Sequence, residues 1–214
     1  APVAAIGGSL LATGLLCCVA IWVKSTVTLI LFGIGLSSLA GALMALVTNF
    51  APNPFYLSDM ITWMLGSVAN RSLLDIALVL PFMLAGLLLL LSQRKGLTLL
   101  SLGEDTASTL GLSLTTTRIC VVLGAGLATG AAVSLAGVIG FVGIVTPHLV
   151  RPLVNYEPGK TIIPSAVLGG VFLVLIDIGV RIISTNVELK IGVLAALVGA
   201  PIFIWIASKS GRHE

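Results

Sequence analysis

The sequence predicts an all-α membrane protein, a polytopic bundle of transmembrane helices. Composition is the first reason: 57% of the 214 residues are hydrophobic and only 9% are charged, whereas soluble domains carry about 25% charged residues. The second reason is that several uncharged runs reach the roughly 20 residues that a helix needs to cross a bilayer. These runs are too long and too uniformly apolar for barrel strands, and a helix satisfies its own backbone hydrogen bonds in lipid.

Hydropathy and turn residues divide the chain into seven predicted spans within one transmembrane domain, residues 1–214. The spans are residues 3–23, 27–49, 73–92, 118–138, 141–155, 162–183 and 192–208. The fifth is short and begins among glycines, so the sequence defines its ends least well.

The outer connection, residues 50–72, is long enough to form structure of its own. It contains prolines and the aromatic residues Tyr56 and Trp63. This composition predicts a short interfacial helix whose aromatic side chains lie at headgroup depth.

The inner connection, residues 93–117, is predicted to hold two short helices in a cytoplasmic loop. Ser101 and Glu104 have the spacing of a capping box, and Gly111 suits the position after a helix end, so a helix is expected over 102–110. Ser113 is placed to start a second short helix that leads into the fourth span. A compact, solvent-facing knob of this kind suits docking to another protein.

Gly126 and Gly130 form a G-x-x-x-G pattern in the fourth span. Small residues at this spacing let helix backbones approach closely. Packing within one subunit is favoured over a dimerisation face.

The distribution of Lys and Arg predicts the orientation, because cytoplasmic loops of membrane proteins are enriched in these residues. Eight lie on one side, which is therefore assigned to the cytoplasm together with the C-terminus: Lys24, Arg94, Lys95, Arg118, Arg151, Lys160, Lys209 and Arg212. Three lie on the other: Arg71, Arg181 and Lys190. Seven crossings then put the N-terminus outside, so we expect a preceding segment to have carried it there; N-out insertion without a signal is the alternative.

No catalytic residue, metal site or cofactor is predicted. The sequence has no G-x-x-x-x-G-K-[ST] loop for nucleotide phosphates and no H-E-x-x-H, and its only histidines are His148 and His213. The three cysteines lie inside apolar runs, which indicates packing rather than disulfides or metal binding. The scattered basic residues form no patch for nucleic acid.

Two polar residues within predicted spans have a structural interpretation and a functional one. Asp177 lies four residues before Arg181, on the same helix face, so an ion pair is favoured over a proton relay. For His148, a neutral ring hydrogen-bonded within the bundle is favoured over a ligand role.

Four motifs, in order, carry a resemblance to a known family. They lie at residues 103–112 (GEDTASTLGL), 134–151 (SLAGVIGFVGIVTPHLVR), 188–192 (ELKIG) and 199–203 (GAPIF). Together they resemble the FecCD family, the permeases of type II ABC importers for ferric siderophores, haem and cobalamin. The resemblance covers essentially the whole chain and implies ten helices per subunit, of which this chain holds about seven, the fourth to the tenth.

The resemblance also implies partners and a location. In such importers two permease subunits, identical or different, enclose a path across the bacterial inner membrane. Two ATPase subunits dock from the cytoplasm, and a periplasmic binding protein delivers the ligand. The chain itself is then no enzyme, because ATP is hydrolysed on the separate ATPase chain.

Site residues follow from the same resemblance. The coupling helices that dock to the ATPase correspond to residues 101–114, with Ser101, Gly103, Glu104, Asp105, Leu110 and Gly111 as the coupling residues. For Glu104, charge pairing with the ATPase and helix capping both stay open.

Further residues are assigned to the path and to the outer surface. Arg181 matches a position that pairs with a glutamate of the binding protein, and Ser25 and Thr26 resemble the cytoplasmic gate. The spans 27–49 and 192–208 are expected to line the path. Lys190 stands where the family usually has proline, so the resemblance does not carry over a proline kink at this position.

Three other function classes compete with this interpretation. A secondary transporter or channel would need more ionisable residues in its spans than Asp177. A membrane-embedded enzyme would need a nucleophile with a partnered base. A truncated subunit that does not transport is the third. The motifs do not distinguish siderophore, haem and cobalamin as the ligand.

Overall fold

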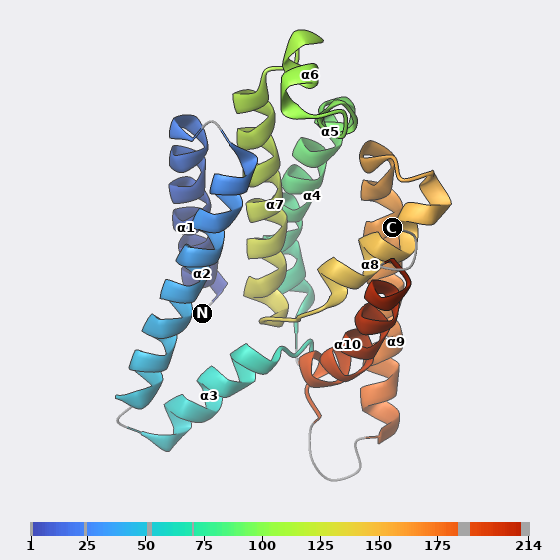
Figure 1. The fold of residues 1–214 in the computed structure, drawn as a ribbon. Coiled ribbons are helices and arrows are strands. Elements are labelled where there is room, and N and C mark those ends of the chain that lie inside the picture. Colours follow the sequence, from blue (N-terminus) through green and yellow to red (C-terminus); the bar gives the residue numbers. More distant parts are fainter. Residues whose placement is uncertain (1, 24, 51–52, 70, 184–188, 211–214) are drawn as a thin grey trace. The chain divides into compact units, whose positions relative to one another are not determined.

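The computed structural model describes residues 2–23, 25–50, 53–69, 71–183 and 189–210, and within these ranges every regular element is a helix (Figure 1). The elements are α1 (Pro2–Trp22), α2 (Thr26–Asn49), α3 (Pro54–Leu65), α4 (Leu73–Ser92), α5 (Arg94–Leu100), α6 (Glu104–Thr109), α7 (Leu114–Ala136), α8 (Val142–Val150), the 3₁₀ helix η1 (Arg151–Val154), α9 (Pro158–Ile183) and α10 (Ile191–Ser210). The all-α fold class is therefore confirmed.

The chain divides into two compact units. Unit 1 comprises Ala1–Ile61 and Arg71–Leu135, and unit 2 comprises Thr62–Asn70 and Ala136–Glu214. Unit 1 thus holds α1, α2, most of α3, and α4 to α7. Unit 2 holds the end of α3 and the helices α8, η1, α9 and α10.

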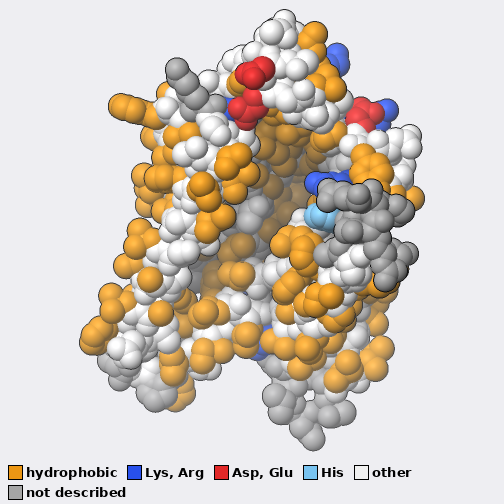
Figure 2. Space-filling model, in the orientation of Figure 1, with side chains coloured by type: hydrophobic (Ala, Val, Ile, Leu, Met, Phe, Trp, Pro, Cys, Tyr) orange, Lys and Arg blue, Asp and Glu red, His pale blue; other side chains and the backbone are white. Residues whose placement is uncertain are grey.

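Five of the described helices are long and apolar enough to cross a membrane: Ala5–Trp22, Thr26–Asn49, Leu73–Ser92, Leu114–Ala136 and Pro158–Ile183. Their surface is apolar too, and α2 has no buried residue along its 24 positions. Figure 2 shows hydrophobic side chains over much of the visible face, with few charged ones among them. Lipid or a neighbouring apolar surface must cover such a helix, because water would not solvate it.

The fifth predicted span is short, as its sequence indicated, whereas α10, in the seventh, runs over 20 residues, Ile191–Ser210. Val142–Val154, made of α8 and η1, is a shorter apolar stretch. At about 1.5 Å per residue it reaches only about 20 Å, less than the roughly 30 Å of the hydrocarbon core. Asn155, in left-handed conformation with φ 53°, ends η1, and such a residue cannot continue a right-handed helix.

Small residues bring the helices of unit 1 together. A Cβ on Gly86 of α4 would lie 2.6 Å from the Gly124 carbonyl oxygen of α7, so the two backbones are in contact. On another face of α7, Gly126 lies against Thr13 of α1 and Gly130 against Ser9. The G-x-x-x-G motif therefore packs against a helix of its own chain, as the sequence analysis favoured.

The helix predicted over 102–110 is real but begins later, and the predicted capping box is wrong. Helix α6 starts at Glu104 after Gly103, which has φ 96°, and no side chain caps it. The Ser101 hydroxyl instead donates to the Thr98 carbonyl oxygen at 2.7 Å. That carbonyl belongs to α5, a helix that the sequence analysis did not separate, so Ser101 closes α5 and does not open α6.

The predicted end of α6 is confirmed at Gly111. Its φ is 85°, its N–H donates to the Ser108 carbonyl, and the Leu112 N–H donates to the Ala107 carbonyl, both at 3.0 Å. This pair of bonds is a Schellman motif, which satisfies carbonyls at a helix end. The second short helix expected from Ser113 does not exist separately, because α7 runs unbroken from Leu114 to Ala136.

Three further predictions concern the connections and residues that the structure does not describe. The helix expected within 50–72 is α3. The α10 helix begins at Ile191, directly after Lys190, so the chain enters this helix at the expected place without the proline. Lys24, Glu188, Arg212 and His213 lie outside the described residues, as do the side chains of Tyr56 and Lys209.

Candidate functional site

The residues predicted to couple to an ATPase form an exposed surface on α5, α6 and their connections, here called the knob (residues 94–113). Ser101, Gly103, Asp105, Leu110 and Gly111 are all exposed, whereas Glu104 is half-buried. Only Ala107 of α6 is fully buried. Leu102 and Leu110 are each 59% exposed, which gives the knob apolar side chains that a partner surface can cover.

Glu104 turns away from this surface and binds two other parts of unit 1. Its Oε1 accepts hydrogen bonds from the Thr26 hydroxyl and from the Thr26 backbone N–H, the latter at 3.2 Å. Its Oε2 forms an ion pair with Arg118 Nη2 at 2.7 Å. The carboxylate thus joins α6 to the first turn of α2 and to the first turns of α7.

Arg118 completes the arrangement from the other side. Its Nε donates to the Thr26 hydroxyl oxygen at 3.2 Å, and its Nη1 donates to the Val23 carbonyl oxygen at 3.3 Å. We call Val23, Thr26, Glu104 and Arg118 the polar cluster. It brings together the predicted gate residue Thr26 and the predicted coupling residue Glu104, which are 78 positions apart in the chain.

Burial makes the ion pair of the polar cluster an internal one. The Arg118 side chain is 6% exposed and that of Glu104 is 35% exposed. The pKa of Glu104 is held below its usual range, first by the hydrogen bond from the Thr26 hydroxyl and next by that from Arg118. Glu104 is therefore a carboxylate at neutral pH, and its charge compensates the buried guanidinium.

Sequence reasoning missed the role of Arg118, which entered only the count of cytoplasmic charges. A signal was available: Arg118 is the last charged residue before an uncharged run of 32 residues, and a charge at the start of a span needs a partner. For Glu104, the structure shows neither a capping bond to its own helix nor a carboxylate turned fully outward.

The other predicted gate residue, Ser25, is exposed and precedes α2 as its N-cap. Its backbone is extended, with φ −112° and ψ 133°, but its side chain makes no capping hydrogen bond. The Ser25 side chain therefore does not give the first backbone N–H groups of α2 the hydrogen bond that an N-cap residue usually provides. Glu104 binds one of them instead, the Thr26 N–H.

The predicted pairing of Asp177 with Arg181 is confirmed in α9. Arg181 Nε lies 2.8 Å from Asp177 Oδ2, and the Arg181 side chain is 73% exposed while that of Asp177 is 27% exposed. A guanidinium has five N–H donors. Arg181 is therefore able to hold Asp177 and bind a second carboxylate at the surface.

His148 in α8 is hydrogen-bonded within its own unit. Its Nδ1 lies 2.8 Å from the Ile144 carbonyl oxygen, and its ring meets the edge of Phe203 in α10 with centroids 5.9 Å apart. These contacts agree with the structural interpretation of this residue. Across the described residues, no three His, Cys, Asp or Glu side chains are grouped to hold a metal ion.

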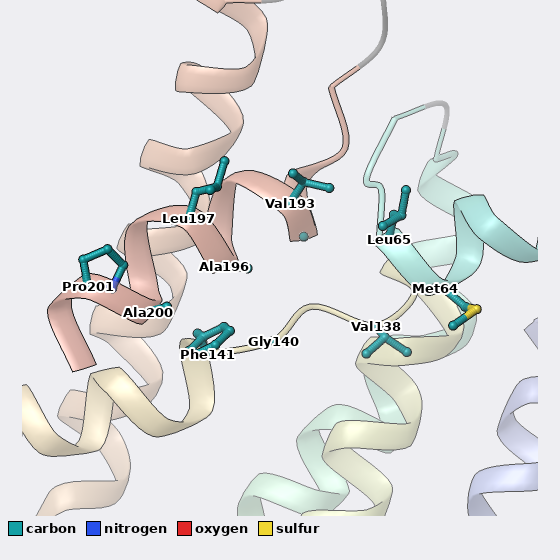
Figure 3. A pocket seen from close by; sticks show the side chains of 11 residues that line it. Met64, Leu65, Val138, Gly140, Phe141, Val193, Ala196, Leu197, Ala200 and Pro201 are labelled. Atoms are coloured by element: carbon teal, nitrogen blue, oxygen red, sulfur yellow. The ribbon is translucent and has the colours of Figure 1, made fainter. Parts of the chain in front are cut away.

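A cavity of about 660 Å³ lies within unit 2, where α10 faces the end of α3 and the segment before α8 (Figure 3). Its walls are entirely apolar side chains and glycine, among them Met64, Phe141 and Pro201. From α10 the lining residues are Gly192, Val193, Ala196, Leu197, Ala200 and Pro201. This spacing of three and four places them on one face of the helix, so one face of the predicted path-lining helix borders open space.

Known proteins with similar sequences include permeases of ABC transporters. The chain is 38% identical over 188 residues to an uncharacterised ABC transporter permease protein, YvrB, of Bacillus subtilis, covering 88% of this chain and 53% of that protein. It is 37% identical over 213 residues to the vitamin B12 import system permease protein BtuC of Salmonella typhi, covering 97% of this chain and 63% of that protein. The chain thus spans between half and two thirds of the length of these relatives.

A solved structure agrees with the fold. It is a metal-chelate-type ABC transporter in an inward-facing conformation, with a TM-score of 0.83 and 30% sequence identity over 96% of this chain and 72% of that one. The model of the FecCD transport family matches residues 1–209, and the chain therefore belongs to the FecCD transport family.

Proposed function

We propose that this chain is the membrane-spanning permease part of a type II ATP-driven importer in the bacterial inner membrane. The observation that carries the proposal is the FecCD match over residues 1–209, together with an exposed knob to which an ATPase subunit can bind. The apolar surface of the five long helices supports the membrane location. ATP is hydrolysed on a separate chain, and this chain carries the motion.

The proposed partners are a second permease subunit, two cytoplasmic ATPase subunits and a periplasmic binding protein. The ATPase is proposed to dock on the knob through Ser101, Gly103, Asp105, Leu110 and Gly111, with Glu104 behind them. The exposed leucines of α6 and its flanks support this, because the centre of a protein interface is apolar and desolvated. The C-terminus is then cytoplasmic.

On the opposite side, Arg181 is proposed to bind a carboxylate of the binding protein. Its 73% exposure and its remaining donors support this role. Ser25 and Thr26 are proposed to form the cytoplasmic gate, and α2 and α10 to line the path. The apolar cavity along α10 supports the last assignment.

The proposed ligand is of the iron–siderophore type, with haem or cobalamin as the alternatives within this family. The apolar walls of the unit 2 cavity suit passage of a bulky ligand without tight binding, since they offer no charged side chain. The named relatives include a vitamin B12 permease, which supports a large chelate as the cargo.

Retention of the cognate ATPase by the purified permease tests the proposal. Leu110→Asp and Asp105→Arg should each lower ATPase retention about tenfold or more, because each places a wrong charge at the interface, and tenfold corresponds to about 1.4 kcal/mol. Glu157→Gln is the matched control, since it removes a cytoplasmic ion pair with Lys160 at 2.7 Å that lies outside the knob. Retention unchanged by both knob variants would contradict the proposed docking.

A further inference from the structure

The start of α2 is capped by a residue from the knob. A helix begins with backbone N–H groups that have no partner inside the helix, and the side chain of the local N-cap residue, Ser25, does not bind them. Glu104 Oε1 accepts from the N–H of Thr26, the first residue of α2, and from its hydroxyl. A carboxylate there also interacts favourably with the positive end of the helix dipole.

Burial does not fix the position of this cap. No residue of α2 is buried, although the helix lies against α1, so no enclosed core holds its first turn in place. The first turn of α2 therefore depends strongly on its polar bonds to Glu104 and Arg118. Whatever displaces the knob acts on the start of α2 through these bonds.

Arg118 keeps the carboxylate in position. The guanidinium is almost completely buried and shares its donors among Glu104, Thr26 and Val23. Removing a partner from a buried ion pair is strongly unfavourable, because it leaves an uncompensated charge. The polar cluster therefore moves as one body or breaks in a discrete step.

We propose that Glu104 is a positioning residue that caps α2 from the knob and, held by Arg118, transmits displacement of α6 to the gate residues Ser25 and Thr26. The inference rests on the proposed function, since the displacement is supplied by the ATPase docked on the knob. Glu104 then transmits the displacement, and the exposed residues of the knob bind the ATPase.

The decisive variant is Thr26→Val, which removes the hydroxyl bonds to Glu104 and Arg118 and leaves the knob surface unchanged. A cysteine at Ser25, with Cys17, Cys18 and Cys120 replaced by alanine, reports the gate. Its rate of labelling by a membrane-impermeant maleimide is measured in the permease–ATPase complex without nucleotide and after trapping with ATP and vanadate. The parent should show a difference of about fivefold or more, the lower range of coupling between two sites.

In Thr26→Val this nucleotide-dependent difference should fall to less than about twofold, while ATPase retention stays at the parent level. Thr26→Ser keeps the hydroxyl and should preserve the parent response. Glu104→Ala combined with Thr26→Val should be no worse than Glu104→Ala alone, because both remove the bond between the Thr26 hydroxyl and Glu104. Glu157→Gln, outside the cluster, should leave the response unchanged.

A full nucleotide response in both Thr26→Val and Glu104→Ala, with the ATPase retained, would overturn the inference; the second variant is needed because Thr26→Val keeps the bond from the Thr26 N–H to Glu104. So would additive losses in the double variant. Failure of the parent itself to retain an ATPase is a different result, because it removes the proposed function and with it the motor that the inference requires. If Thr26→Val does not fold, Glu104→Gln, which keeps the shape but weakens the ion pair, replaces it with the same expected loss.

Discussion

Charge is rare in this chain, and three ion pairs are found among the described residues. Arg118 is paired with Glu104, Asp177 with Arg181, and Lys160 with Glu157. The first pair is internal, the second lies within α9, and the third joins the first turn of α9 to the residue before it. An exposed pair within one helix adds only a few tenths of a kcal/mol, whereas the internal pair joins three segments and sets their geometry.

Protonation of Glu104 should weaken the polar cluster only in acid. Because the folded-state pKa of Glu104 is lowered, the stabilisation is complete above the unfolded-state pKa and is lost as the pH falls through the lower folded-state pKa. Hydrogen exchange of the Thr26 amide should therefore show constant protection from neutral pH down to the usual carboxyl range of about 4.3 and lose it below.

In Glu104→Gln this acid dependence should vanish, because no titratable group is left at the cap. Asp105→Asn is a suitable comparison, since Asp105 is the exposed neighbour in the same helix turn. If the amide of Thr26 loses protection in acid equally in the parent and in Glu104→Gln, the link between this carboxylate and the start of α2 is refuted.

Helices in this chain are defined by hydropathy along the sequence, but small residues decide which helices touch. Gly86 and Gly124 allow α4 and α7 to approach until their backbones are in contact. The glycines of α2 do not share this role, since Gly35 and Gly41 have nothing within 4 Å of an added Cβ. The same residue type therefore marks a contact in one helix and an open surface in another.

Gly86→Ala should destabilise the α4–α7 contact by about 1–3 kcal/mol, the usual cost of overpacking. The new Cβ would lie 2.6 Å from the Gly124 carbonyl oxygen and 2.7 Å from the Ala128 backbone nitrogen, and backbone atoms cannot rotate away. Gly41→Ala is the matched control and should be neutral or slightly stabilising, since alanine favours helix.

The measurement is the midpoint of thermal unfolding of the two purified variants in the same detergent. A lowered midpoint for Gly86→Ala with an unchanged or raised midpoint for Gly41→Ala is the expected result. Equal midpoints for both variants would show that α4 and α7 have room to separate, contrary to the packing described above.

For the molecule as a whole, the Lys and Arg distribution predicts that the knob faces the cytoplasm and Arg181 the periplasm. The shortness of Val142–Val154 does not change this assignment for the knob, because that assignment rests on the charges flanking α4 and α7. Both of these helices are long enough to span.

Cysteine labelling from the two sides of the membrane tests this orientation. With the native cysteines replaced, a cysteine at the exposed Ser108 of α6 should react only with reagent on the cytoplasmic face. A cysteine at Ile182, which is 75% exposed beside Arg181, should react only from the periplasmic face. The reverse pattern would place the knob away from nucleotide and remove the basis for motor docking.

Particular residues show how far sequence reasoning reaches in this protein. Gly111 was predictable as a helix end because the left-handed conformation strongly favours glycine. Asp177 and Arg181 were predictable because four residues along one helix bring side chains together. The capping box at Ser101 was predicted wrongly, because the same serine also has a carbonyl of α5 within reach, and that choice depends on a helix that hydropathy did not separate.

The sequence by itself determined the membrane class, the long helices, the exposed loop between α4 and α7 and, through its motifs, the family. These properties depend on composition and on neighbours a few residues apart. Only the tertiary structure decided that Glu104 caps α2 and that Arg118 holds it there, because those bonds join residues 78 and 92 positions apart. No local pattern specifies which buried charge will meet which helix end, since that depends on how closely packed backbones bring them together.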